Sequence, residues 1–238
     1  MRKDGRKFNE LRPVKITTGF VKYAEGSVLI ECGDTKVLCN ASVEDRVPPH
    51  VRPGHGWVTA EYSMLPRANR ERSRRDIDKL KLSSRSAEIQ RLIGRSLRAA
   101  VDMEALGERT ITIDCDVLQG DGGTRTASVT GGFIALALAC RKLVEEGYIG
   151  RNPIRHFAAG VSAGIVDDTA VLDLPYSEDS RAQVDLNCIM NELGEIIEIQ
   201  GTGEGRAFTV AEQQNLLELC AKGNRELIAK QREILGGL

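Results

Sequence analysis

Short apolar runs in the first part of the chain predict β-strands. The runs SVLIEC (27–32) and TKVLCNASV (35–43) are separated only by Gly33 and Asp34. They therefore predict a hairpin with a glycine-led tight turn. WVTAEYSM (57–64) predicts a third strand.

Helical spacing of apolar residues appears in three later segments. Apolar positions recur at helical intervals from Ile89 to Val101 and stop before Gly107, which predicts a helix with one buried face. A helix from about 126 to 146 is apolar nearly all round and rich in Ala and Gly, so we expect it to pack on several sides. Residues 211–235 predict a closing amphipathic helix.

Further strands lie between and after these helices. RTITIDCDVL (109–118) alternates strictly, which predicts one apolar face and one face that is either solvated or catalytic. SRAQVDLNCIM (180–190) and GEIIEIQGTG (194–203) predict two more strands. Because strands and helices follow no regular βαβ period, we predict an α+β fold with mixed β-sheets and packed helices. No long Ser/Gly/Pro linker interrupts the chain, so we expect residues 1–238 to form a single domain.

The second half of the chain echoes the first. GDTKVL (33–38) recurs as DDTAVL (167–172), and SVEDR (42–46) recurs as SEDSR (177–181). Each copy predicts a hairpin whose second strand leads to an acidic loop. Two short matches are equally compatible with an internal duplication and with chance.

Composition and charge describe an ordinary globular protein. Apolar residues make up 41% and charged residues 28% of the 238 residues, as in soluble globular domains. The formal net charge is −1, so a nucleic-acid site would have to be local. The six cysteines form no C-x-x-C pair, and we expect buried thiols in a reducing, cytoplasmic compartment. No window approaches the ~20 apolar residues of a membrane span.

The segment QGDGGTRTASVTGG (119–132) is a candidate anion site. It follows a predicted strand and opens a predicted helix, where free amides and the helix dipole favour negative charge. Glycines allow close approach of the backbone, and Arg125 offers a planar fork for phosphate oxygens. The segment lacks the Gly-Lys-Ser/Thr ending of a Walker loop and the spacing of a dinucleotide fingerprint. The alternative is a glycine-rich turn with Thr126 as an N-cap.

An arginine-rich segment is a candidate nucleic-acid surface. Residues 66–82 contain seven Lys or Arg residues and little to bury, so we expect a mobile loop. Arginine is well suited to backbone phosphates, and without interleaved aromatics the contact would be independent of base sequence. The alternative is a solvated loop with no ligand. The candidate residues are Arg67, Arg70, Arg72, Arg74 and Arg75.

Other charged residues differ in how strongly they suggest a site. Arg91, Arg95 and Arg98 are expected on a solvated helix face, with Arg98 and Asp102 spaced as an i, i+4 pair. Arg85 stands at the start of the same helix, where a cation opposes the dipole, and an anion would explain it.

Asp179 and Asp185 form a candidate acidic pair. A straight strand would separate them by about 20 Å, too far to share one small ion. They converge only if the chain bends between them, plausibly at Ser180-Arg181. The alternative is two ordinary surface acids.

Several long motifs, in order, are similar to those of the ribonuclease PH family of phosphate-dependent 3′-to-5′ exoribonucleases, which trim transfer RNA precursors. The similarity runs nearly end to end. The matching segments are MRKDGRKFNELRP (1–13), CNASVEDRVPP (39–49), GWVTAEYSMLPRA (56–68), EIQRLIGRSLRA (88–99), DCDVLQGDGGTRTAS (114–128), VDLNCIM (184–190) and EIQGTGE (198–204).

This resemblance implies a fold, an assembly and a set of site residues. It implies the ribonuclease PH fold with an internal pseudo-repeat, and a homohexameric ring built as a trimer of dimers. It implies that the arginine-rich loop 67–75 holds the acceptor stem of transfer RNA, partly from a neighbouring subunit. The implied phosphate site is Arg85, Gly123, Thr124 and Arg125, and the implied catalytic pair is Asp179 and Asp185.

The implied reaction converts RNA(n+1) and inorganic phosphate into RNA(n) and a nucleoside diphosphate. Asp185, with Asp179, would bind Mg²⁺ or protonate the leaving 3′-oxygen, and we favour the metal because an aspartate of ordinary pKa is a poor acid at neutral pH. Transfer RNA precursors and other RNA 3′ ends, including ribosomal RNA, are the expected partners. Two alternatives are a catalytically silent ring subunit that only threads RNA and a small-molecule phosphotransferase.

Overall fold

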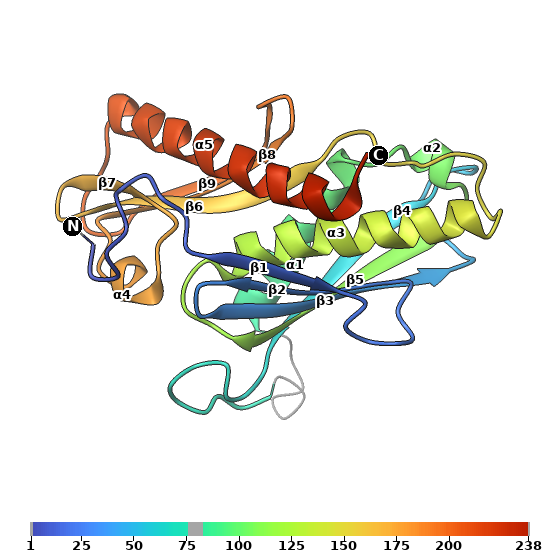
Figure 1. Ribbon diagram of the computed structural model, residues 1–238, viewed down its shortest axis with the longest axis horizontal. Helices are drawn as coiled ribbons and strands as arrows, with labels where there is room; N and C mark the ends of the chain where they lie inside the picture. Colours follow the sequence, from blue (N-terminus) through green and yellow to red (C-terminus); the bar gives the residue numbers. More distant parts are fainter. Residues whose placement is uncertain (1, 76–82, 238) are drawn as a thin grey trace.

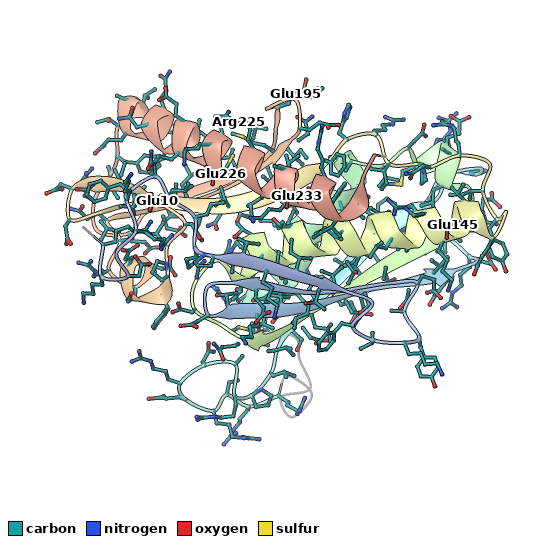
Figure 2. The ribbon with its side chains drawn as sticks, in the orientation of Figure 1. Glu10, Glu145, Glu195, Arg225, Glu226 and Glu233 are labelled. Carbon is teal, nitrogen blue, oxygen red and sulfur yellow. The ribbon has the colours of Figure 1, made fainter. Side chains whose placement is uncertain are left out.

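The computed structural model describes residues 2–75 and 83–237. It consists of two sheets with helices between and outside them (Figure 1). Helices α1 (Ser84–Ala99) and α3 (Thr124–Glu145) pack on one sheet, and α5 (Val210–Leu235) covers the outer face of the other. The exposed side of α5 carries Arg225, Glu226 and Glu233 (Figure 2).

The first sheet contains five strands among the described residues, in the order β1-β2-β3-β5-β4. Neighbouring strands are antiparallel except β4 and β5, which are parallel. The predicted hairpin is confirmed, and Gly33 takes a φ of 56° in its turn, a conformation that glycine adopts without steric cost. The strands are β1 (Val14–Thr18), β2 (Gly26–Cys32), β3 (Thr35–Glu44), β4 (Trp57–Met64) and β5 (Thr110–Gln119).

The second sheet has the order β7-β6-β8-β9 and is antiparallel throughout. Its central strand β6 is buried along its whole length because α3 covers one face and α5 the other. Two short helices, α2 (Met103–Leu106) and α4 (Tyr176–Asp179), lie in connections. The strands are β6 (Ala158–Val166), β7 (Thr169–Leu172), β8 (Val184–Asn191) and β9 (Ile196–Gly203).

Helix α3 lies between the two sheets and contacts strands of both. Within the described residues it is the one helix long and apolar enough for a membrane span, so the expectation that no window of the sequence approaches such a span is wrong. In the fold, 78% of its most apolar window is buried inside the protein. Its surroundings confirm the prediction of a helix packed on several sides. Glycines allow close approach, since a Cβ at Gly26 would lie 1.9 Å from the Ala135 oxygen and one at Gly131 would lie 2.7 Å from Ile30.

The structure supports the internal echo in part. Each copy of the D-T-x-V-L motif begins the second strand of a hairpin, β3 in the first sheet and β7 in the second. The second pair of matches is not equivalent, because 42–46 extends along the end of β3 whereas 177–181 contains helix α4. The prediction of an acidic loop in both copies is therefore wrong. The six cysteines are free and buried, as predicted.

Candidate functional site

A cleft of about 800 Å³ opens where the end of β5 and the start of α3 face α4 and β8. Its walls come from both halves of the chain. The structure brings the predicted phosphate and acidic residues together in this one cleft. They are Arg85, Gly123, Thr124, Arg125, Asp179 and Asp185.

The glycine-rich segment forms a tight loop into α3. Gly122 and Gly123 have φ values of 77° and 66°. Gly123 is the N-cap of α3 and supplies no side chain to cap the first-turn amides. Those amides have no partner within the helix and lie at the positive end of its dipole. The alternative of Thr126 as N-cap is therefore wrong, and its hydroxyl instead donates to the Gly123 carbonyl oxygen at 3.0 Å.

The glycine loop is fixed from behind by hydrogen bonds. The Thr35 hydroxyl donates to the Gly122 carbonyl oxygen at 2.7 Å and accepts from the Asp121 amide at 2.9 Å. The hydroxyls of Tyr62 and Thr124 lie 2.8 Å apart. These contacts hold the loop in one conformation, so that its amides are preorganised for an anion.

Substituting Gly122 with alanine should damage this loop more than its backbone conformation alone requires. A Cβ there would lie 2.4 Å from the Leu174 carbonyl oxygen. Gly54 is a matched control, since its φ is 78° and nothing lies within 4 Å of a Cβ. We expect Gly54→Ala to cost about 1–2 kcal/mol of unfolding free energy. Gly122→Ala should cost more unfolding free energy than that. Equal losses for the two variants in chemical denaturation would contradict the close packing of this loop.

Two arginines approach the loop from different helices. Arg125, in the first turn of α3, donates from Nη1 to Gln200 Oε1 at 2.6 Å and to Glu88 Oε1 at 3.3 Å. Gln200 also donates to Glu88 at 3.0 Å. Arg85 lies in the first turn of α1 and is exposed to solvent. Sequence reasoning missed Glu88 and Gln200, although the spacing of Arg85 and Glu88 places them on one helix face.

The two aspartates lie on opposite sides of a bend in the chain. Asp179 ends α4 and Asp185 is the second residue of β8, with both side chains lining the cleft. Burial raises the pKa of Asp179, against the opposing charges of Arg85 and Arg125. Burial and then the charge of Asp179 raise the pKa of Asp185 to about 6. Both carboxyls are therefore protonated more easily than an ordinary aspartate.

The arginine-rich loop stands beside the cleft. Arg70 lines it, and Arg74 and Arg75 line an adjoining hollow that also contains Arg85. Arg67 donates to the Arg70 carbonyl oxygen at 2.8 Å, and Arg72 is exposed. Residues 76–82 of the loop expected to be mobile lie outside the described residues.

Other charged residues discussed in the sequence analysis make contacts outside the cleft. The polar face of β5 carries Asp114 and Asp116 beside Glu61. Both aspartates are half-buried, and neither is among the residues that line the cleft. Asp102 pairs with Arg151 at 2.7 Å.

The expected Arg98–Asp102 pair is wrong, since Arg98 stacks 4.3 Å from the Trp57 ring and donates to Val58. Arg95 pairs with Glu198 at 2.7 Å.

Comparison with known proteins gives consistent matches over the chain. Residues 10–142 match the model of the 3′ exoribonuclease family, domain 1, and residues 156–223 match domain 2. The chain is 57% identical over 236 residues to ribonuclease PH of Syntrophomonas wolfei, covering 99% of both chains. It is 58% identical over 238 residues to ribonuclease PH of Bacillus subtilis, covering 99% of this chain and 97% of that one.

Solved structures agree at the level of the fold. An Archaeoglobus fulgidus exosome structure with RNA bound to the active site superposes with a TM-score of 0.82 at 24% identity, covering 96% of this chain and 92% of that one. At this identity the likeness extends to the arrangement of sheets and helices only. The predicted α+β architecture of the ribonuclease PH fold is confirmed. Of the two sheets in the described residues, the first is mixed and the second is antiparallel.

Proposed function

Because the chain belongs to the 3′ exoribonuclease (ribonuclease PH) family and is a phosphate-dependent 3′-to-5′ exoribonuclease that processes transfer RNA, we propose that its cleft places inorganic phosphate against the last phosphodiester linkage of an RNA 3′ end. The observation that carries this proposal is the meeting of an uncapped helix N-terminus, two arginines and two aspartates in one cleft.

Phosphate binds at the start of α3 in this proposal. The amides around Gly123 and Thr124 donate to its oxygens, and Arg85 and Arg125 neutralise part of its charge. Arg125 uses Nη1 for Gln200 and Glu88. A guanidinium has five N–H donors, so Nε and Nη2 can donate to phosphate. The Glu88–Gln200 contact fixes the direction of the fork. The phosphate is thereby aimed at the acidic side of the cleft.

Asp179 and Asp185 suit a Mg²⁺ ion. Mg²⁺ is commonly held by one or two carboxylates together with substrate phosphates. No cluster of three or more His, Cys, Asp or Glu side chains able to hold a metal is found in the described part of the chain, so this ion would depend on the RNA for further ligands. The raised pKa values of the two carboxyls suit a site that binds a cation. The pKa of Asp185, raised to about 6, also suits the alternative in which it protonates the leaving 3′-oxygen. When bound, Mg²⁺ would stabilise the charge that develops on the transferred phosphoryl group.

The reaction is a phosphoryl transfer between two anions. Two unit charges 4 Å apart repel by about 1 kcal/mol in water and about 4 kcal/mol at an effective dielectric of 20. The arginines and helix dipole offset this repulsion, and the fixed loop orients phosphate for in-line attack. The new P–O bond joins phosphate to the terminal nucleotide, and the bond to the 3′-oxygen of the preceding nucleotide breaks. The products are a nucleoside diphosphate and an RNA shorter by one residue.

The arginine-rich loop is proposed to hold the backbone of precursor transfer RNA, and RNA 3′ ends including ribosomal RNA are the wider substrate class. Its support is the position of Arg70 in the wall of the cleft. Replacing Arg70, Arg72, Arg74 and Arg75 with glutamine should weaken transfer RNA binding and flatten its salt dependence, since fewer counterions are released. Filter binding at several salt concentrations measures both quantities. An unchanged salt slope would remove the loop from the RNA surface.

We further propose a cytoplasmic homohexamer, a trimer of dimers, in which the chain acts as a single domain. Ile196 and Ile199 are partly exposed on β9, the edge strand of the second sheet, and an exposed apolar edge favours association. The free cysteines suit a reducing compartment. One hydrophobic core includes buried residues of both sheets, which supports the single domain.

The proposal is tested by incubating the protein with a 3′-extended transfer RNA, with and without inorganic phosphate. We expect nucleoside diphosphates only when phosphate is present. Release of monophosphates with water as the only cosubstrate would refute phosphorolysis. A silent ring subunit would release nothing, and a small-molecule phosphotransferase would leave the RNA intact. Both arginines and both aspartates of the expected site are present in this chain, which disfavours the silent subunit.

A further inference from the structure

The N-terminal segment, residues 2–13, runs past β7 and α4 before it enters β1 (Figure 1). Its backbone is tied to the second sheet, since the Leu172 amide donates to the Phe8 carbonyl oxygen at 2.7 Å. Three of its arginines are buried, with 7%, 9% and 5% of Arg2, Arg6 and Arg12 exposed. Arginines are almost never fully buried unless they are paired, so their partners indicate what the segment does.

Arg12 joins the glycine loop to the connection that leads into α4. Its Nη1 donates to the Asp121 carbonyl oxygen at 2.5 Å and its Nη2 to that of Gly122 at 3.3 Å. The same guanidinium binds both carboxylate oxygens of Asp173, with Nη2 to Oδ1 at 2.7 Å and Nε to Oδ2 at 3.1 Å. The Arg12 backbone amide also donates to Asp173 at 2.7 Å.

Arg2 holds α4 itself. It donates to the Glu178 carboxylate three times, at 3.0, 3.2 and 2.5 Å, and Glu178 immediately precedes Asp179 in the chain. The same side chain donates to the carbonyl oxygens of Leu172 at 2.6 Å and Asp173 at 2.8 Å. Both partners of the ion pair are buried, with side-chain exposures of 2% and 6%.

These contacts surround a strained turn in the backbone. Asp173 has a φ of 55°, which is uncommon for a residue other than glycine. Arg6 adds a hydrogen bond to its carbonyl oxygen at 3.1 Å. Forked guanidinium–carboxylate pairs have a fixed geometry, and a buried pair gains more from its Coulomb attraction than an exposed one. The arginines therefore fix both the conformation of this turn and its position against the glycine loop.

We infer that Arg12 and Arg2 are positioning residues that set the placement of Asp179 relative to the phosphate held at the start of α3. The inference rests on the proposed roles of these two groups. Neither arginine lines the large cleft. Arg2 acts through α4, whereas Arg12 acts through the glycine loop and also through its charge, which opposes the rise in the pKa of Asp179. A displacement of about 1 Å between reacting groups can cost on the order of a hundredfold in rate, so a small relaxation of these contacts is sufficient.

The experiment compares Arg12→Lys, Glu178→Gln and a control variant, Gln231→Ala. Lysine keeps the charge of Arg12 but is a point charge that cannot bridge Asp173 and two carbonyl groups. Gln231 is fully buried and donates to the carbonyl oxygens of Thr130 and Ala158, away from the cleft. Its replacement lowers stability without touching the arginine contacts. All proteins are assayed well below the lowest Tm, with initial rates at varied phosphate and varied transfer RNA.

We expect Arg12→Lys and Glu178→Gln to lower kcat about 10–100-fold. The KM for transfer RNA should change less than about twofold, because Arg12 and Glu178 bind the glycine loop, the Asp173 turn and Arg2 and not the arginines of the RNA-binding loop. Gln231→Ala should retain the wild-type kcat. Millimolar methylguanidine should partly restore kcat to Arg12→Ala and leave Gln231→Ala unchanged, which a general loss of stability would not produce.

The inference is overturned if both folded variants keep kcat within twofold of wild type, or if Gln231→Ala loses as much kcat as they do. Failure of the proposed function is distinguishable, since the wild-type protein would then release no nucleoside diphosphate with phosphate. If Arg12→Lys does not fold, Glu178→Gln decides by the same criteria.

Discussion

Arg125→Ala is expected to lower kcat/KM for phosphate by about 10²–10³-fold, the loss found when a preorganised donor to a developing anion is removed. Two effects combine. The cleft loses a cation at the start of α3, and Glu88 loses the arginine that now lies 3.3 Å away. An uncompensated carboxylate near the glycine loop adds to the repulsion of phosphate. Arg85→Ala should act in the same direction, and phosphate titrations of the initial rate measure both.

The matched control is Arg95→Ala, which removes an arginine of α1 paired with Glu198 at 2.7 Å. Arg95 does not line the cleft, so its loss should leave the KM for phosphate unchanged. Transfer RNA affinity should stay within about threefold in all three variants. An equal loss of RNA affinity and of phosphate affinity in Arg125→Ala would count against the assignment of this arginine to the phosphate.

Asp185→Asn is expected to lower kcat about 10³-fold and at the same time to stabilise the protein. If Asp185 holds Mg²⁺ as proposed, the activity falls because an amide is a weaker ligand for Mg²⁺ than a carboxylate, and several kcal/mol of charge stabilisation would depend on that ligand. The stability rises because burial and Asp179 raise the pKa of Asp185 to about 6. At neutral pH the metal-free fold holds a charge that it disfavours, by on the order of 1–3 kcal/mol.

The ionisation of Asp185 also predicts how the stability of the protein depends on pH. In the unfolded chain the carboxyl ionises near its ordinary pKa of 3.8, whereas in the fold it ionises near 6. The contribution of Asp185 to the stability of the metal-free protein should therefore fall as pH rises from about 4 to 6. Over that range the stability of Asp185→Asn should increase relative to that of the wild type. Melting curves with EDTA across this range test the point, with Asp168→Asn on an exposed turn as control. An Asp185→Asn protein that is inactive and also less stable would point to a structural role.

Local patterns in the sequence predicted most strands and the long helices, because alternation and helical spacing are properties of neighbouring residues. They gave no strand at Val14–Thr18, which is β1, and began the strand of Val184–Asn191 four residues too early. The prediction of a strand at 57–64 matches β4 without change. Strand β6 was implied only by the echo with the first half, because AAGVSAGIV has few β-branched residues and no alternation. Its strand state depends on burial by α3 and α5, which no local pattern contains.

The site could be predicted only where a residue type and its local position were both informative. The glycine loop and Arg125 stand at a strand-to-helix junction, which is visible in the sequence. The contact of Arg125 with Gln200 joins residues 75 positions apart, and that of Arg12 with Asp173 joins residues 161 positions apart. Such partners are set by how the two sheets pack around α3. The bend that brings Asp179 and Asp185 into one cleft was a condition of the prediction, and α4 provides it.

Helix α3 connects the core of the protein to the proposed phosphate site at its first turn. Ala135, against which Gly26 packs, lies eleven residues after Thr124, or about 16 Å along the helix axis. Because α3 is closely packed between the two sheets, a shift at Ala135 is transmitted along the helix to its first turn. A side chain larger than hydrogen at Gly26 requires β2 or α3 to shift, because its Cβ would lie 1.9 Å from the Ala135 oxygen. The placement of the first turn of α3, where we propose that phosphate binds, therefore depends on a backbone contact in the core.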